Sequence, residues 1–363
     1  MTELSRGAVE AALKKYIDPH YDTDLVDAGC VSKIEIGGGK VSVTVDLGYP
    51  AKRLISRLTI ELSECLRNLP GVDSVEVDID WHIVSRAVQQ GQKPLPGVKN
   101  ILAVASGKGG VGKSTVTTNL ALALALEGAR VGVLDADVYG PSIPRMLGVS
   151  GQPESRDGEN IEPLRAYGLE VMSIGFLVEE DTPMIWRGPV ATRALQQFLN
   201  QTRWGDLDYL LVDLPPGTGD ILLTLTQQIP VSGAVIVTTP QDIALLDAMK
   251  GLKMFEKVNV PVLGVIENMS LHICSQCGHE EPIFGQGGGE KMAQKYHIPL
   301  LGQLPLDISI RENVDSGHPT MVSEPTGPIG RQFHRIAIKT AARLALRPKD
   351  KAGIFPKIVV END

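Results

Sequence analysis

The chain has 363 residues, of which 43% are hydrophobic and 21% charged, and its formal net charge at pH 7 is -8. This composition is typical of a soluble globular protein with two or three domains, and the negative charge argues against nucleic acid or an anionic membrane as a partner. No apolar run approaches the roughly 20 residues of a membrane span, and the N-terminus carries Glu3 and Glu10 instead of a targeting signal. We therefore expect a cytoplasmic protein.

The first part of the chain, 1–83, predicts a small α+β domain. Apolar residues at helical spacing predict two helices, and alternation of apolar with polar residues predicts three strands. These elements lie at 6–17 (helix), 31–48 (two strands in a hairpin), 51–69 (helix) and 72–81 (strand). Cys65 shares the apolar face of the second helix, so we expect it in the core of this domain.

A polar stretch with two prolines at 84–98 predicts a linker and a domain boundary. From 99 to 345, short runs rich in Val, Ile and Leu are separated by segments with helical patterns. Within the short runs, apolar and polar residues do not alternate. Strands of this kind are buried on both faces, which predicts an α/β domain whose mostly parallel sheet is covered by helices on both sides. The last residues, 346–363, predict a loosely tethered tail.

The segment GKGGVGKS at 107–114 follows a predicted buried strand and precedes a predicted helix. It fits the phosphate-loop pattern, in which glycines let backbone N–H groups close around phosphates at a helix N-terminus. Lys113 would reach the β- and γ-phosphates of ATP, and the Ser114 hydroxyl would ligate Mg²⁺. The residues that we expect at the nucleotide are Gly107, Lys108, Gly109, Gly110, Val111, Gly112, Lys113, Ser114 and Thr115.

Lys108 is surplus to the phosphate-loop pattern, which needs only Lys113. Loop lysines are commonly just solvated. A cation this early in the loop can instead point away from its own phosphates and neutralise charge on the nucleotide of a neighbouring subunit. The residues alone leave both interpretations open.

Carboxylates follow two further predicted strands of the α/β region. Asp135 and Asp137 come after one strand, and Asp213 ends another, in the segment LLVDLPPGTGD at 210–220. At the end of such a strand a carboxylate can hold Mg²⁺ through water, which we expect of Asp213. Elsewhere, carboxylates at these places form caps and turns.

Cys274 and Cys277 stand in a C-x2-C pattern. A redox dithiol would open a helix, which the residues around the pair do not favour. A structural zinc knuckle could take His279 as a third ligand. An iron–sulfur cluster needs four thiolates; because one chain has only these two well-placed cysteines, such a cluster would require two chains.

The segment GKGGVGKS resembles the deviant Walker A sequence of the family that includes the septum-site ATPase MinD, the nitrogenase iron protein and the Mrp/ApbC proteins. In that family the early lysine crosses a dimer interface. The resemblance thus implies a homodimer in which Lys108 and Lys113 both serve catalysis. It also implies that Asp137 lies in the first switch region and orients the attacking water, and that Asn268 reads the adenine edge.

Together with the cysteine pair, residues 95–325 resemble the Mrp/ApbC iron–sulfur carrier ATPases, and residues 1–85 resemble a small domain found in cluster-assembly factors. This resemblance implies a slow, Mg²⁺-dependent ATP hydrolase with a cluster, most simply [4Fe-4S], bound between Cys274 and Cys277 of both subunits. ATP would act as a conformational switch. The implied partners are a cluster assembly scaffold as donor and apo iron–sulfur proteins as acceptors. Cys30 is expected to be structural.

Two rival functions make different demands on the sequence. A positioning ATPase like MinD, with a structural zinc knuckle, would need a basic amphipathic helix at its C-terminus, whereas this chain ends in the acidic residues Glu361 and Asp363. A nucleotide kinase would need a cluster of arginines in a lid over a second phosphate substrate. The arginines between 140 and 200 are scattered.

Overall fold

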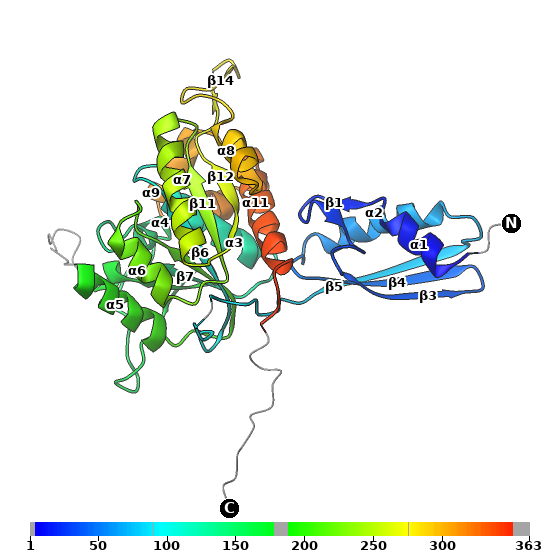
Figure 1. Ribbon diagram of the computed structural model, residues 1–363, viewed down its shortest axis with the longest axis horizontal. Helices are drawn as coiled ribbons and strands as arrows, with labels where there is room; N and C mark the ends of the chain where they lie inside the picture. Colours follow the sequence, from blue (N-terminus) through cyan, green and yellow to red (C-terminus); the bar gives the residue numbers. More distant parts are fainter. Residues whose placement is uncertain (1–3, 90, 178–187, 275, 351–363) are drawn as a thin grey trace, which may run out of the picture.

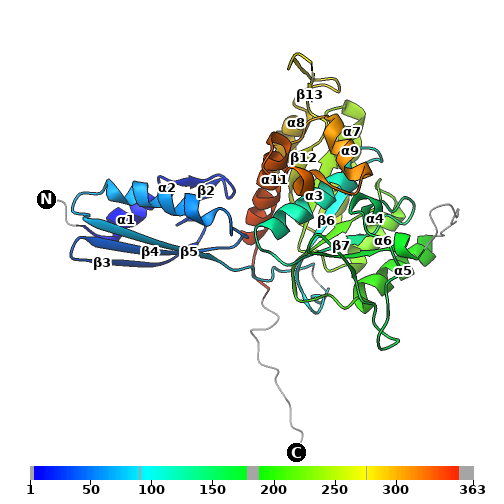
Figure 2. The ribbon, with the colours of Figure 1, turned by 180° about the vertical axis from the view of Figure 1, so that it is seen from behind.

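The computed structural model describes residues 4–89, 91–177, 188–274 and 276–350. A small N-terminal part, blue in Figure 1, lies beside a larger α/β part that holds the central sheet, and Figure 2 shows the same arrangement from behind. Among the described residues, no helix combines the length and the apolar character needed to cross a bilayer.

The N-terminal part is a three-stranded sheet in the order β3-β4-β5, with two helices. Strands β3 and β4 form an antiparallel hairpin, and β5 runs parallel to β4. The predicted hairpin is confirmed, and its turn uses Gly38 and Gly39 at positive φ. Two short strands, β1 and β2, pair in the loop after α1. The elements are α1 (Arg6–Leu13), β1 (Ile17–Asp18), β2 (Thr23–Asp24), β3 (Val31–Gly37), β4 (Lys40–Leu47), α2 (Ile55–Arg67) and β5 (Ser74–Trp81).

Alternate residues of β4 and every fourth residue of α2 form the core of this part. Leu58, Leu62 and Leu66 of α2 are buried, as are four residues of β4 (Val41, Val43, Val45 and Leu47). The prediction for Cys65 is wrong: its residue is only half-buried. The buried stripe runs through positions four apart, and Cys65 lies beside that stripe, not on it.

The larger part contains an eight-stranded sheet in the order β15-β12-β11-β6-β10-β7-β9-β8. Among these strands all neighbours are parallel except β8 and β9, which are antiparallel. The predicted parallel sheet is therefore confirmed, with one antiparallel edge strand added. The strands are β6 (Val98–Ser106), β7 (Val131–Asp135), β8 (Leu164–Ala166), β9 (Leu169–Ser173), β10 (Leu207–Asp213), β11 (Gly233–Thr238), β12 (Val262–Glu267) and β15 (Leu300–Gln303).

Helices cover both faces of this sheet, which explains why its inner strands are buried along almost their whole length. Helices α5, α6 and α7 lie in front of the sheet in Figure 1, and α3 and α4 lie in front of it in Figure 2. The helices are α3 (Lys113–Leu126), α4 (Ile143–Met146), α5 (Gly188–Gln201), α6 (Asp220–Gln228), α7 (Asp242–Lys257), α8 (Gly288–Tyr296), α9 (Ile308–Asp315), α10 (Thr320–Ser323) and α11 (Pro328–Ala345), with a 3-10 turn η1 (Ile174–Phe176).

The topology gathers the candidate site residues at one edge of the sheet. The phosphate loop follows β6, Asp137 follows β7, Asp213 ends β10 and Asn268 follows β12. Carboxyl ends of parallel strands meet at one edge, where open α/β sheets bind their ligands. Because β10 lies between β6 and β7, Asp213 lies between the phosphate loop and Asp137.

The predicted linker and the predicted tail contact each other. Ala87 N–H donates to the Pro348 carbonyl, and Asp350 N–H donates to the Ser85 carbonyl. Residues 346–350 are therefore held against the linker, and the prediction of a loosely tethered tail is wrong for these residues. The remainder of the predicted tail, 351–363, lies outside the described residues.

We predict that Leu62→Ala lowers the free energy of unfolding by about 2–5 kcal/mol, because it removes a fully buried side chain and leaves a cavity. Cys65→Ala, three residues along the same helix, should cost about 1 kcal/mol or less because Cys65 is half-buried. Equilibrium urea denaturation of both variants checks this. Equal costs at the two positions would contradict the assigned burial.

Candidate functional site

The phosphate loop joins β6 to α3 in a conformation that only glycine takes readily. Gly110 and Gly112 have φ of 79° and 82°. A Cβ at Gly112 would lie 2.3 Å from Asn268 Nδ2, and one at Gly107 would lie 2.2 Å from the carbonyl carbon of Asp247. At Gly107 the neighbour is backbone, so no larger residue fits, and at Gly112 the positive φ and the nearby Asn268 amide both favour glycine.

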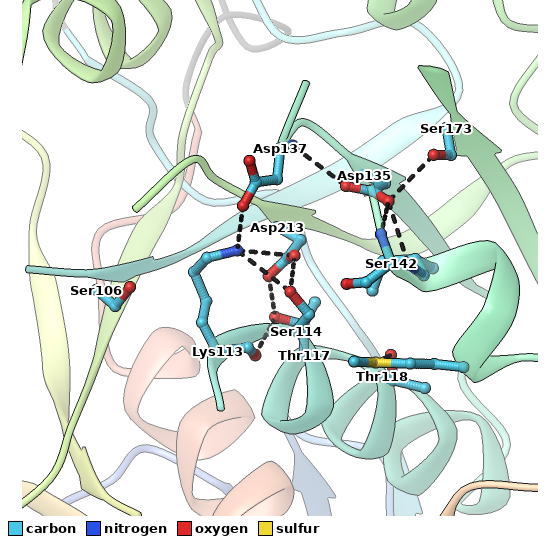
Figure 3. A network of polar contacts seen from close by, with 12 residues as sticks. Ser106, Lys113, Ser114, Thr117, Thr118, Asp135, Asp137, Ser142, Ser173 and Asp213 are labelled. Carbon is cyan, nitrogen blue, oxygen red and sulfur yellow. Dashed lines mark hydrogen bonds and ion pairs between the residues drawn. The ribbon is translucent and has the colours of Figure 1, made fainter. Parts of the chain in front are cut away.

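The ammonium group of Lys113 lies among carboxylates. Its Nζ is 2.8 Å from Asp213 Oδ2 and 3.8 Å from Asp137 Oδ2, and Figure 3 shows the lysine side chain reaching toward both. The Lys113 side chain is 6% exposed and that of Asp213 is 0% exposed. The structure thus brings together three of the predicted site residues from β10, α3 and the loop after β7.

Asp213 also binds two hydroxyl groups of α3. Ser114 donates to Asp213 Oδ2 at 2.5 Å, and Thr117 donates to Asp213 Oδ1 at 2.8 Å. A hydroxyl beside a carboxylate is the hard oxygen donor set that Mg²⁺ prefers, so these residues fit the predicted ion. Sequence reasoning missed Thr117. The signal was available, since Thr117 follows Ser114 by three residues and hence shares its helix face.

The two carboxylates at the end of β7, Asp135 in the strand and Asp137 after it, have different surroundings. Asp135 is fully buried and accepts hydrogen bonds from Ser142 N–H, Ile143 N–H and the Ser173 hydroxyl at 3.1–3.2 Å. It therefore holds the loop after β7 in place. Asp137, with its side chain 13% exposed, faces Lys113 Nζ.

Burial raises the pKa of Asp135 to about 7, with a further contribution from the Asp213 carboxylate. Burial also raises the pKa of Asp137. Both carboxyl groups therefore hold a proton more tightly in the folded chain than in water.

Lys108 lies half-buried at the outer side of the phosphate loop. Its Nζ is 3.4 Å from Gln241 Oε1, and Thr239 donates to the same oxygen at 2.9 Å. Its ammonium therefore contacts the residue that precedes α7, away from the cluster of carboxylates around Lys113. Sequence reasoning missed Gln241, because the contact spans 133 positions of the chain.

The other predicted nucleotide contacts lie around the same loop. Gly109 and Gly110 are exposed, Val111 is buried, and Thr115 lies in the first turn of α3. Asn268 Nδ2 donates to the Val111 carbonyl at 2.8 Å. The Asn268 side chain thus holds the loop, and a contact with adenine stays a prediction.

The cysteine pair lies on a short hairpin that follows β12. Its strands, β13 (His272–Ile273) and β14 (Glu280–Glu281), are antiparallel, and Figure 1 shows β14 at the end of the hairpin that extends beyond the central sheet. Cys274 N–H donates to the His279 carbonyl at 2.9 Å. The pair therefore occupies the turn of an extended hairpin at the carboxyl edge of the sheet.

The two thiols are accessible. Cys277 is exposed and Cys274 is partly exposed. Backbone N–H groups, that of Gln276 first, lower the pKa of Cys274, which favours the thiolate that binds metals.

No third metal ligand joins this pair within one chain, as far as the described residues go: they contain no group of three His, Cys, Asp or Glu side chains that could hold a metal ion. Within the described residues, His279 forms no three-ligand group with the two thiols. Cys30 is buried in the N-terminal core, where burial raises its thiol pKa, as expected of a structural cysteine.

Two family models match the chain. The model of the NUBPL iron-transfer P-loop NTPases matches residues 97–341. A model of an iron–sulfur cluster assembly protein matches residues 6–79.

Relatives with known names are similar over most of the chain. The iron–sulfur cluster carrier protein of Haemophilus influenzae is 50% identical over 345 residues, which are 95% of this chain and 93% of that protein. The iron–sulfur cluster transfer protein NUBPL of Mus musculus is 50% identical over 288 residues, 78% of this chain and 90% of that protein.

Solved structures share the fold of the larger part. A nucleotide-binding protein from Archaeoglobus fulgidus, in complex with ADP, is 40% identical with a TM-score of 0.57 and covers 65% of this chain and 92% of its own. The cell division ATPase MinD of Pyrococcus furiosus, 23% identical with a TM-score of 0.50 over 66% of this chain and 97% of its own, has a similar fold.

We predict a pH dependence of stability from Asp135. Its pKa is about 7 when folded and about 3.9 when unfolded, so the folded state binds the proton more tightly. The resulting stabilisation is complete below about pH 4 and is lost as the pH rises through about 7. Asp135→Asn should flatten this decline, as urea denaturation between these pH values can measure.

The matched control is Asp206→Asn. Arg130 lowers the pKa of the exposed Asp206, so this carboxylate does not titrate in the same range and its loss should leave the slope as in the parent chain. Parallel curves for Asp135→Asn and the parent chain would contradict the prediction.

Proposed function

The chain belongs to the NUBPL iron-transfer P-loop NTPase family, and from this we propose that it is a homodimeric ATPase that carries an iron–sulfur cluster and transfers it to apo-proteins. Its relatives are named as cluster carrier and cluster transfer proteins. The cluster is the cargo, received from an assembly scaffold, and ATP controls when it is held and released.

The observation that carries this proposal is the incomplete ligand set of the cysteine hairpin. Cys274 and Cys277 offer two accessible thiols, and the described residues of one chain add no third ligand. A cluster of the [4Fe-4S] type takes four thiolates. Two hairpins that meet at a two-fold axis supply them, because a symmetric dimer presents each surface twice.

Exposed apolar side chains at the same edge support a second copy as the partner. Ile243 and Leu246 near the start of α7 are 70% and 54% exposed, Ile308 at the start of α9 is 64% exposed, and Ile273 and Ile283 of the hairpin segment are 43% and 52% exposed. Apolar side chains that gather on one side of a molecule favour burial in an interface.

Nucleotide binding is assigned to the phosphate loop. The β- and γ-phosphates of ATP would compete with Asp137 and Asp213 for the Lys113 ammonium, which both carboxylates approach within 4 Å. Ser114 and Asp213 would hold Mg²⁺, which neutralises phosphate charge when bound. Asp137, freed from Lys113, would orient the attacking water. Because these groups position and neutralise more than they transfer protons, hydrolysis would be slow.

The switch would use the contacts between the phosphate loop and the strand ends. Gly217 N–H donates to the Ser106 carbonyl at 3.0 Å, so the turn after β10 is bonded to the start of the loop. A change at the γ-phosphate would reach this turn directly and, through Lys108, the partner subunit. Two dimer arrangements would then differ in how far the cluster is exposed to an acceptor.

We predict that anaerobic reconstitution with iron and sulfide gives a brown dimer with about four irons per two chains. Cys274→Ser should lose the iron and the visible absorbance and keep its affinity for MgADP, because the hairpin is separate from the phosphate loop. Cys65→Ser is the matched control and should bind iron normally. A colourless protein that holds zinc, or loss of iron in the control as well, would contradict a shared cluster.

We predict that Lys113→Ala and Lys108→Ala each lower kcat for ATP hydrolysis by on the order of 100-fold, since each removes a cation from the transition state. Lys108→Ala should still bind MgADP, because Lys108 contacts Gln241 and not the carboxylates around Lys113.

Mixing the two variants tests whether Lys108 acts across the dimer. In a mixed dimer the Lys108→Ala chain keeps its own Lys113 and receives Lys108 from its partner, so one of two sites is complete. Statistical exchange of subunits should restore about a quarter of the wild-type rate. A mixture that stays inactive despite exchange would place Lys108 on its own nucleotide.

A further inference from the structure

We infer that Glu127 is a positioning residue that couples docking of the N-terminal domain to nucleotide binding at the opposite end of α3. This inference rests on the nucleotide binding that the proposed function assigns to the phosphate loop. It needs no cluster.

Glu127 is the C-cap of the helix that carries the phosphate-binding residues. Helix α3 begins with Lys113 and has 14 residues, so its two ends are about 20 Å apart. Lys113 and Ser114 bind Asp213 at its first turn. Glu127, the residue after Leu126, is fully buried at the other end.

The N-terminal domain supplies hydrogen-bond donors to this end of α3. Lys52 N–H donates to the Glu127 carbonyl at 3.2 Å, and Arg53 N–H donates to Glu127 Oε2 at 2.7 Å. Lys52 and Arg53 lie in the turn that leads into α2. The last carbonyl groups of a helix have no partner within it, and anions are stabilised near a helix N-terminus. The Lys52 N–H therefore satisfies a carbonyl at the C-terminal end of α3, and the Glu127 carboxylate lies near the N-terminal end of α2, where an anion is stabilised.

A third element joins the same carboxylate. His334 of α11 has its Nε2 2.7 Å from Glu127 Oε1. With Glu127 ionised its carboxylate only accepts hydrogen bonds, and Nε2 is then the donor. Both oxygens of Glu127 are thus bonded, one to the N-terminal domain and one to α11, which packs along α3.

Two neighbouring contacts show how close the docking is. Gly128 has φ +95°, and a Cβ there would lie 3.2 Å from Trp81 Cζ2 of the N-terminal domain. Asp22 binds Lys339 Nζ of α11 at 2.9 Å and also Arg343. Figures 1 and 2 both show the N-terminal domain next to the lower end of α11.

These contacts give the coupling a direction. A docked N-terminal domain holds the Glu127 end of α3, and because α3 is one continuous helix this also restricts the positions open to Lys113 and Ser114 when nucleotide binds. By linkage, nucleotide bound at the first turn must then stabilise the docked arrangement by the same factor.

The test compares Glu127→Ala with Glu127→Gln in the full chain. The alanine variant loses both side-chain bonds. The glutamine variant keeps both, because its amide oxygen accepts from Arg53 N–H and its amide donates to His334 in the other tautomer. We expect Glu127→Ala to weaken MgADP binding about fivefold or more, measured by calorimetry, and Glu127→Gln to stay within about twofold of wild type.

Hydrogen exchange at the contact between the two domains measures the same coupling. In the wild type, MgADP should slow hydrogen exchange of the Lys52 and Arg53 amides. The expected factor equals the factor by which Glu127→Ala lowers the affinity for MgADP. A purely structural contact would not give this response. Unchanged exchange on adding MgADP, or unchanged MgADP affinity in Glu127→Ala with accelerated exchange at these amides, would overturn the inference.

If circular dichroism shows that Glu127→Ala does not fold, Trp81→Ala takes its place. It loosens the docking from the N-terminal side and leaves the larger domain unaltered, and the same two outcomes decide the matter. The wild-type affinity for MgADP tests the proposed function, and the difference between variants tests the coupling, so the two can fail separately.

Discussion

The contact between Lys113 and Asp213 organises the larger domain around its phosphate loop. A fully buried carboxylate is costly unless it is paired and hydrogen-bonded, and Asp213 meets this need entirely through groups of α3: the Lys113 ammonium, the Ser114 hydroxyl and the Thr117 hydroxyl. Strand β10 is thereby bonded to the start of the helix. A phosphate that draws the ammonium away changes the partners of Asp213, so the same contact that stabilises the site makes it responsive to its ligand.

The parallel topology determines what this contact can control. All central strands end at the same edge, so the phosphate loop, Asp137 and the cysteine hairpin lie on one side of the sheet. The opposite end of α3 meets the N-terminal domain through Glu127. One helix therefore connects the edge that carries the proposed chemistry to the domain that lies away from it, and each connection includes hydrogen bonds to a buried carboxylate.

Some errors of the sequence-based prediction share a cause. Helical spacing predicts Cys65 in the core, and the structure leaves it half-buried because the buried side of α2 runs through Leu58, Leu62, Ser63 and Leu66. Residues 346–350 contact the linker more than 250 positions earlier in the chain. Periodicity reports which side of an element is apolar. It does not report how much of that side the neighbouring element covers, or which distant segment of the chain packs against it.

The sequence by itself determined the class of fold, the parallel sheet, the phosphate loop and the cysteine pair, because each depends on residues that are neighbours in the chain or repeat at a short period. The tertiary structure decided that Asp137 and not Asp135 faces Lys113, that Lys108 contacts Gln241, and that Glu127 joins three elements. These pairs lie between 24 and more than 200 positions apart. Only the packing of strands and helices brings such residues within the few ångströms over which hydrogen bonds and ion pairs act.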